Sequence, residues 1–182
     1  MENAGKIFEN DVKKSCQKDG IFVHRIKDNA MSYTQSDSVY TTKNDYDFLI
    51  YKRPILLALE LKHTEKTSMS IQMDEQDSDK KMIKMHQRNG LMKASQYDGV
   101  AAGFLLSFVC GESQKELTYF LSIENFEKFL VVSQKKSINL VDIATHGGIR
   151  VNQKLLRNHY HYQIDELCDI LANNLTNNDV TE

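Results

Sequence analysis

N-D-Y-D-F-L-I-Y-K-R-P-I-L-L-A-L-E-L-K, residues 44–62, contains two apolar runs separated by a short basic turn. Residues 48–51 suit one strand, and residues 55–61 suit a longer strand that is apolar enough to lie inside a sheet. Pro54 fits the first position of the second strand, where its missing N–H does least harm. The sequence therefore predicts a β-hairpin whose second arm is interior.

The acidic residues of this hairpin are expected to meet on one face. Side chains alternate between faces along a strand, so Glu60 and Lys62 share one face while the neighbouring leucines point to the core. If residues 52–53 form a two-residue loop, Asp45 lies opposite Glu60, and Asp47 lies on the same face. A loop one residue longer would turn one strand over and separate the carboxylates.

Three carboxylates and an ammonium in one place favour metal-assisted chemistry. Carboxylates repel one another unless a cation lies among them, and Mg²⁺ takes oxygen ligands from one or two carboxylates together with water. Such an ion beside a lysine suits the attack of water on a phosphate. The alternative is a surface hairpin with a solvated charged face. Glu-x-Lys inside an apolar strand favours the functional interpretation, because an unpaired buried charge is costly.

Length and composition predict one soluble globular domain. The chain has 182 residues, of which 41% are hydrophobic and 26% charged, as in an ordinary domain with its own core. The net charge of −2 and the pI near 6.3 give no overall nucleic-acid signature, so a polyanionic partner must meet a local basic surface. We expect a single domain over residues 1–175 and a polar tail over residues 176–182.

Cysteine usage and hydropathy predict a cytoplasmic protein. Cys16, Cys110 and Cys168 lie far apart with no C-x-x-C pair, which argues against a zinc cluster and against a disulfide framework. Free thiols indicate a reducing compartment. The N-terminus lacks an apolar signal core, and the most apolar stretch, residues 99–110, is shorter than the about 20 residues that span a bilayer. We therefore expect no membrane partner.

Hydrophobic periodicity predicts helices and strands on both sides of the hairpin. Asn3 is a plausible N-cap for a helix that ends near Lys18, and Glu9 lies beside its apolar stripe, facing either inward or solvent. Residues 27–43 are predicted to be a loop, and residues 64–81 a mobile or projecting insertion. The other expected elements are strands at 21–26, 100–109 and 117–122 and helices at 80–96, 123–132 and 163–175.

Basic residues near the hairpin in sequence offer a candidate DNA-facing surface, although solvated lysines are the default. The candidates are Lys66, Lys84, Arg88 and Lys93. His159 and His161 offer two imidazoles on one strand face, but with no third ligand in sequence reach an aromatic patch is the better interpretation. The patterns G-x-x-x-x-G-K-[ST], G-x-G-x-x-G and H-E-x-x-H are absent from the sequence, and serine-nucleophile and nucleotide-fold hypotheses have no support.

Six short blocks resemble one nuclease family. They are G-K-I-F-E at 5–9, D-Y-D at 45–47, E-L-K-H-T at 60–64, H-Q at 86–87, D-G-V-A-A-G-F-L-L-S-F at 98–108 and K-S-I-N-L at 136–140. An early Glu, an Asp before a hairpin and Glu-x-Lys on its second strand resemble the core of the PD-(D/E)xK nuclease superfamily. The blocks together span most of the chain and resemble more closely the RecU family of bacterial and phage Holliday junction resolvases.

This resemblance implies a restriction-endonuclease-like α/β core, with a mixed central β-sheet flanked by helices. It implies a homodimer that binds four-way DNA junctions and cuts two opposing strands symmetrically, with Mg²⁺ or Mn²⁺ as cofactor. Glu9 would be an accessory active-site residue from the first helix. Two alternatives stay open: a nuclease of the same core without junction preference, and a DNA-binding protein that has lost its activity.

The resemblance also implies roles for the hairpin residues. Asp47 and Glu60 match the metal-binding acidic residues, and Lys62 matches the lysine that stabilises the transition state. Gln87 matches a glutamine implicated in the same site, and Asp45, found where the family commonly has threonine, is a further candidate ligand. The sequence departs from the family in lacking the arginine-bearing N-terminal extension of the bacterial members, and in a longer segment between Glu60 and Gln87. These departures concern junction selectivity more than hydrolysis.

Overall fold

The structure, a computed structural model, describes residues 3–26, 29–31, 40–42, 44–78, 80–111 and 115–178. Its first element is α1 (Ala4–Lys18), which follows Asn3 as predicted. The Asn3 side chain accepts a hydrogen bond from the Gly5 N–H at 3.0 Å and so satisfies one of the free donors of the first turn. The chain leaves the helix through Gly20, whose φ of +71° favours glycine.

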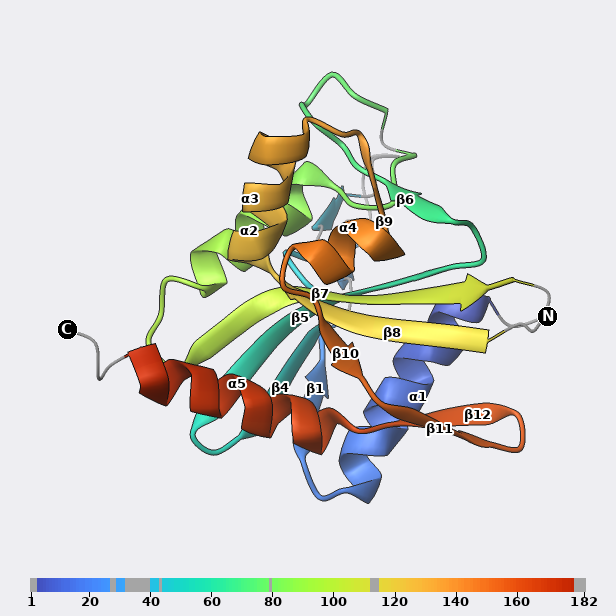
Figure 1. The fold of residues 1–182 in the computed structure, drawn as a ribbon, viewed down its shortest axis with the longest axis vertical. Helices are drawn as coiled ribbons and strands as arrows, with labels where there is room; N and C mark the ends of the chain where they lie inside the picture. Colours follow the sequence, from blue (N-terminus) through green and yellow to red (C-terminus); the bar gives the residue numbers. More distant parts are fainter. Residues whose placement is uncertain are drawn as a thin grey trace.

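A six-stranded mixed sheet forms the centre of the molecule (Figure 1). Its strands, in spatial order, are β1 (Phe22–Arg25), β4 (Phe48–Lys52), β5 (Ile55–Thr64), β7 (Val100–Cys110), β8 (Lys115–Ser122) and β10 (Ile149–Val151). β5 and β7 pair in parallel, and the other neighbouring pairs of this sheet are antiparallel. β5 lies between β4 and β7, which explains why its sequence is mostly apolar.

Helices cover both faces of this sheet (Figure 1). One face carries α1 and α5 (Ile164–Asn178), and the other carries α2 (Met85–Ala94), α3 (Ile123–Ser133) and α4 (Leu140–Thr145). Leu57 and Leu59 of β5 belong to the core under α1 and α5, whereas Ala58 belongs to the core under α2 and α3. The alternating residues of β5 therefore serve two separate cores, and Glu60 points to the side of Ala58.

Three two-stranded antiparallel sheets accompany the central one: β2 (Asn29–Met31) with β3 (Tyr40–Thr42), β6 (Ser68–Ser70) with β9 (Ser137–Asn139), and β11 (Gln153–Leu156) with β12 (His159–Tyr162). The first of these pairs falls within residues 27–43, where the sequence predicts only a loop. Tyr and Thr side chains favour strands, but the polar composition of the segment conceals this preference. The remaining residues of 27–43 lie outside the described part of the chain.

Residues 68–73 of the segment 64–81 are built into the fold, whereas Asp74, Glu75 and Gln76 are exposed, so a projecting insertion stays a prediction for the second half of the segment. Met69 and Ile71 are fully buried in the core under α2 and α3. Ile71 forms a bridge with Ile83, and β6 pairs with β9. Apolar residues alternate with serines in this stretch as in a strand, but the pairing partner lies far along the chain and cannot be identified from local sequence.

The hairpin of β4 and β5 turns one residue later than predicted. Lys52 pairs with Ile55, so the proline between them lies in the turn rather than at the start of the strand. Moving the turn by one residue changes the pairing register of the two strands by two residues, which preserves the face on which every side chain lies. The shift brings Asp47, rather than Asp45, beside Glu60.

Helix ends differ from the predicted ones by several residues. α2 starts at Met85 rather than near Lys80, because Ile83 is held in the bridge described above. α5 continues to Asn178, beyond the predicted end at residue 175. Within the described ranges, every helix is too short or too polar to cross a lipid bilayer.

Candidate active site

The central feature of the site is the buried carboxylate of Glu60 on β5. Its side chain is only 2% exposed, and its neighbours on either side in the strand are leucines. Lys62 Nζ lies 2.6 Å from Glu60 Oε1, and Gln87 of α2 donates a side-chain N–H to the same oxygen. Three of the residues singled out in the sequence therefore meet at one oxygen atom.

Burial gives Glu60 an unusual protonation equilibrium. Its pKa rises from 4.5 to about 8, chiefly because the charged carboxylate loses its hydration. The Lys62 ammonium opposes this rise in pKa, whereas the Asp47 carboxylate adds to it by repulsion and by hydrogen bonding. Asp47 and Glu60 are thus close enough to interact directly. Two interacting carboxylates of this kind favour the binding of a proton or a cation between them.

Main-chain hydrogen bonds hold Asp47 at the entrance to β4. Its Oδ2 accepts from the Leu61 N–H at 3.0 Å, and its own N–H donates to Leu59 O at 3.0 Å. Its carbonyl oxygen accepts from the Ile26 N–H at 2.8 Å, just beyond β1. The residue is therefore attached to the strands on both sides of β4, and its carboxylate is fixed near Glu60.

Asp45 is exposed and packs against α2. A Cβ added at Gly90 would lie 2.2 Å from Asp45 Cβ, far inside van der Waals contact. Glycine at this position therefore allows the helix to approach the chain that leads into β4. The structure places Asp45 at the edge of the site, next to the helix that carries Gln87.

Glu9 makes an ion pair with Arg25 of β1. Arg25 Nε donates to Glu9 Oε2 at 2.7 Å, and its Nη2 lies 2.6 Å from the same oxygen. α1 packs on the sheet face opposite to α2, so this pair lies on the other side of the sheet from Gln87. In the structure Glu9 is thus turned to Arg25, and its expected accessory role is not visible as a contact with Glu60.

The donor set of the site suits a hard divalent cation with few protein ligands. Among the residues that the structure describes, no three His, Cys, Asp or Glu side chains gather as a metal-binding group. Asp47 and Glu60 supply two carboxylates, which is the usual protein contribution to a Mg²⁺ site completed by water. Structural zinc sites need about four nitrogen or sulfur ligands, which are not found here. The residues present therefore fit Mg²⁺ or Mn²⁺.

No model of a known protein family matches the chain. It is 31% identical over 178 residues to the SPbeta prophage-derived uncharacterized protein YotM of Bacillus subtilis (strain 168), and the alignment covers 91% of this chain and 85% of that protein. The chain belongs to the YotM family. This assignment carries no activity with it, because YotM itself is described as uncharacterized.

The fold of this YotM-family chain is similar to that of Hjc from Archaeoglobus fulgidus, a Holliday junction resolvase from an archaeal hyperthermophile. The TM-score is 0.50 with 16% sequence identity, over 80% of this chain and 95% of Hjc. The similarity confirms the predicted fold, a restriction-endonuclease-like core with a mixed central sheet flanked by helices.

The predicted basic surface contains lysines that are exposed or half-buried and one arginine that is ion-paired within the fold. Lys66 and Lys93 are exposed, and Lys84 is half-buried at the start of α2. Arg88 is 14% exposed and forms a two-pronged ion pair with Glu127 of α3, with Nε to Oε1 at 2.7 Å and Nη2 to Oε2 at 2.8 Å. Its charge is thus compensated within the fold, and its role as a DNA contact stays a prediction.

The paired histidines of β12 attach that strand to α1. His159 Nδ1 lies 3.0 Å from Asp11 Oδ1, and His161 Nε2 lies 3.3 Å from Asp19 Oδ2. Both imidazoles thus join β12 to α1 and to the residue that follows it. Sequence reasoning missed these carboxylate partners, and equally missed Glu127, because such pairs join residues that are distant in the chain.

Proposed function

We propose that this YotM-family protein is a divalent-metal-dependent endonuclease of the RecU type that hydrolyses phosphodiester bonds in four-way DNA junctions. The observation that carries the proposal is Glu60, a buried carboxylate in contact with a lysine, an amide and a second carboxylate. Burying an ionised carboxylate in this position lowers the stability of the fold, and such destabilising charges are typical of functional sites. The resemblance to RecU resolvases supplies the substrate class.

Each residue of the site has a proposed task. Asp47 and Glu60 would hold Mg²⁺ or Mn²⁺, and Gln87 would keep the Glu60 carboxylate in one orientation. The bound ion would supply positive charge and Lewis acidity at the phosphate. Lys62 would donate a hydrogen bond from its ammonium group to the phosphate oxygen on which charge develops. Asp45, at the rim, would add a further carboxylate near the ion.

Glu9 is proposed as an accessory residue on the strength of the sequence resemblance. Its carboxylate binds Arg25 in the structure, so its contribution would be to order the end of β1 next to Asp47. Ile26, which follows Arg25, donates its N–H to Asp47 O at 2.8 Å. An effect of Glu9 on cutting would therefore pass through this main-chain contact.

The lysines near the site are proposed to contact DNA. Lys66 follows β5, the strand that carries Glu60. Lys84 immediately precedes α2, and Lys93 lies in its last turn. With a net charge of −2 for the whole chain, DNA binding must depend on such local groups. Two such sites in a twofold homodimer would match the symmetry of a four-way junction and would produce paired cuts.

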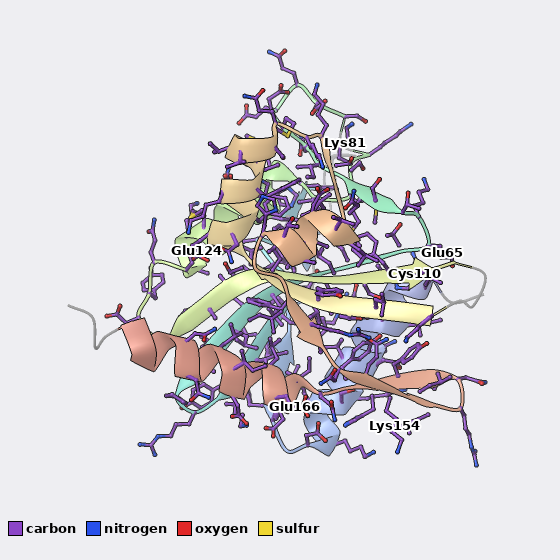
Figure 2. All side chains as sticks on the ribbon, in the orientation of Figure 1. Glu65, Lys81, Cys110, Glu124, Lys154 and Glu166 are labelled. Carbon is purple, nitrogen blue, oxygen red and sulfur yellow. The ribbon has the colours of Figure 1, made fainter. Side chains whose placement is uncertain are left out.

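The test is incubation with end-labelled four-way junctions, with and without Mg²⁺, and mapping of the cuts on each strand. We expect symmetric cuts on two opposing strands that require the ion. Glu60→Gln should abolish cutting while junction binding in a gel shift is retained. Glu65→Gln is the matched control, because Glu65 is an exposed carboxylate just beyond the end of β5 (Figure 2). Full cutting by pure Glu60→Gln protein would contradict the mechanism.

Competition between substrates separates the proposal from its alternatives. A four-way junction and a linear duplex of equal length are mixed, and the cutting of each is followed over time. Preferential cutting of the junction supports the proposal. Equal cutting of both indicates a nuclease of the same core without junction preference, and binding without any ion-dependent cutting indicates a non-catalytic DNA-binding protein.

A further inference from the structure

We infer that Arg88, Glu127 and Gln72 form a brace that holds Gln87 on Glu60, so that Arg88 and Glu127 are positioning residues of the site. The inference deepens the proposed function and rests on it for its catalytic meaning. The position of the Gln87 side chain, and its dependence on the ion pair of the next residue, can be measured independently of any nuclease activity.

Gln87 uses both ends of its amide. Its Oε1 accepts from the Lys84 N–H at 3.0 Å, and its Nε2 donates to Glu60. Because the oxygen is occupied by the start of α2, the NH₂ group is directed at the carboxylate. The position of the first turn of α2 therefore decides whether Gln87 reaches Glu60.

The sequence of α2 stabilises its own first turn only weakly. It spans only 10 residues and contains Gly90, which lowers helix propensity by about 1 kcal/mol relative to Ala. Lys84 stands at its N-cap position, where the preferred residues are Ser, Thr, Asp and Asn, and a lysine ammonium cannot accept a hydrogen bond. The helix start consequently depends on groups from outside the helix.

The brace supplies these groups. Gln72 Oε1 accepts from the Met85 N–H at 3.1 Å and so satisfies a free donor of the first turn. Arg88 Nη1 donates to Gln72 O at 3.0 Å, while its other nitrogens bind both oxygens of Glu127. The Arg88 guanidinium also lies over the Phe126 ring, 5.9 Å from its centroid. Arg88 is thereby held by the 72–73 region and by α3 at the same time.

The geometry of Arg88 suits a positioning role better than a general contribution to stability. A bidentate arginine pair fixes both distance and direction, whereas a single-point lysine pair fixes distance alone. Arg88 is the residue immediately after Gln87, so a displacement of one is transmitted to the other. On the far side of α2, Asp45 packs against Gly90, and the helix is confined between α3 and the entrance to β4.

The first experiment follows the side-chain amide of Gln87 by NMR in the metal-free protein. In the wild type, the two Nε2 protons should have well separated shifts, because one of them is bonded to a carboxylate. Glu127→Gln, which removes the charge but keeps the shape, should collapse this separation, and Arg88→Lys should do so in part. The control is Asp169→Asn, which removes one carboxylate charge on α5 that pairs with Lys52 of β4. This change should leave the Gln87 signals unchanged. Unchanged Gln87 signals in both folded brace variants would overturn the inference.

The second experiment is a double-mutant cycle on Mn²⁺ affinity, measured by calorimetry. Gln87→Ala and Glu127→Gln should each weaken binding by about tenfold, the usual scale for residues that orient metal ligands. If Glu127 acts through Gln87, the double variant should bind no more weakly than Gln87→Ala alone. Fully multiplicative losses would overturn the inference. If the wild type cuts no DNA, the proposed function fails, while the NMR result still decides whether the brace exists.

Discussion

At the scale of single residues, the site is defined by how Glu60 is neutralised. Its carboxylate is buried in an apolar strand and contacts Lys62 and Gln87. Repulsion from Asp47 adds to the cost of the charge, and the combined effect raises the Glu60 pKa to about 8. The same environment that disfavours the free carboxylate favours a bound cation, so metal binding and the stability of the fold should be linked.

A first prediction concerns the pH dependence of stability in a chelator. Folded Glu60 keeps its proton up to a pH of about 8, whereas an unfolded glutamate loses it near 4.5. Its stabilising effect is complete below pH 4.5 and is lost as the pH rises to 8, at no more than about 1.4 kcal/mol per pH unit. Urea unfolding of wild type and Glu60→Gln between pH 5 and 8 measures the difference. Identical pH slopes for both proteins would contradict the account.

A second prediction concerns Gly90→Ala. Alanine is the better helix former by about 1 kcal/mol, so an isolated helix would be stabilised. Here the new Cβ would lie 2.2 Å from Asp45 Cβ, and the resulting overpacking should destabilise the protein by about 1–3 kcal/mol. Gly5→Ala in α1 is the control, since its nearest contact at 3.5 Å is ordinary. Chemical unfolding measures both changes, and a more stable Gly90→Ala protein would contradict the packing described.

At the scale of elements, the sequence predicts those whose signal is local. α1 has an N-cap and a regular stripe, and β5 has an apolar run bounded by a turn, so both are found where expected. The hairpin turn is displaced by one residue, but each side chain keeps its face because the register changes by two residues, an even number. β6 was missed because its partner β9 lies far along the chain, and β2 was missed because both it and its partner β3 are only three residues long.

A third prediction tests whether the segment that contains β6 is packed. Ile71 is fully buried, so Ile71→Ala should reduce the free energy of unfolding by roughly 2–5 kcal/mol. Val132→Ala on α3 is the control, because Val132 is 76% exposed and should change stability by less than about 0.5 kcal/mol. Urea unfolding compares the two variants. Equal, small effects would indicate that residues 64–81 contribute little to the core.

At the scale of the whole molecule, the sequence is sufficient for the fold class and for much of the site. The order of expected helices and strands, with the family resemblance, predicted an α/β fold, and Asp47, Glu60, Lys62 and Gln87 lie together in the structure. The ion pair of Arg88 with α3 could not be predicted, because it depends on the relative positions of two helices. The charge of a residue alone does not show whether its side chain forms an ion pair within the fold or faces solvent.

A fourth prediction concerns the cysteines buried in the core under α1 and α5. Cys16 and Cys168 are fully buried, and burial is the main cause that raises their thiol pKa values to about 12 and about 11. Thiolate is the reactive form, so both should resist alkylation of the native protein at neutral pH. Cys110 is partly exposed and should be labelled first. Mass spectrometry after brief iodoacetamide treatment gives the order, and early labelling of Cys16 would contradict this packing.

The central claim, that carboxylates of Asp47 and Glu60 share one divalent cation, is tested most directly by a crystal structure of the protein soaked in Mn²⁺. An anomalous difference map locates the ion without assumptions about its ligands. We predict a peak within about 2.6 Å of an oxygen from each of these two carboxylates. A strong Mn²⁺ peak elsewhere, with this pair unoccupied at saturating Mn²⁺, would contradict the account.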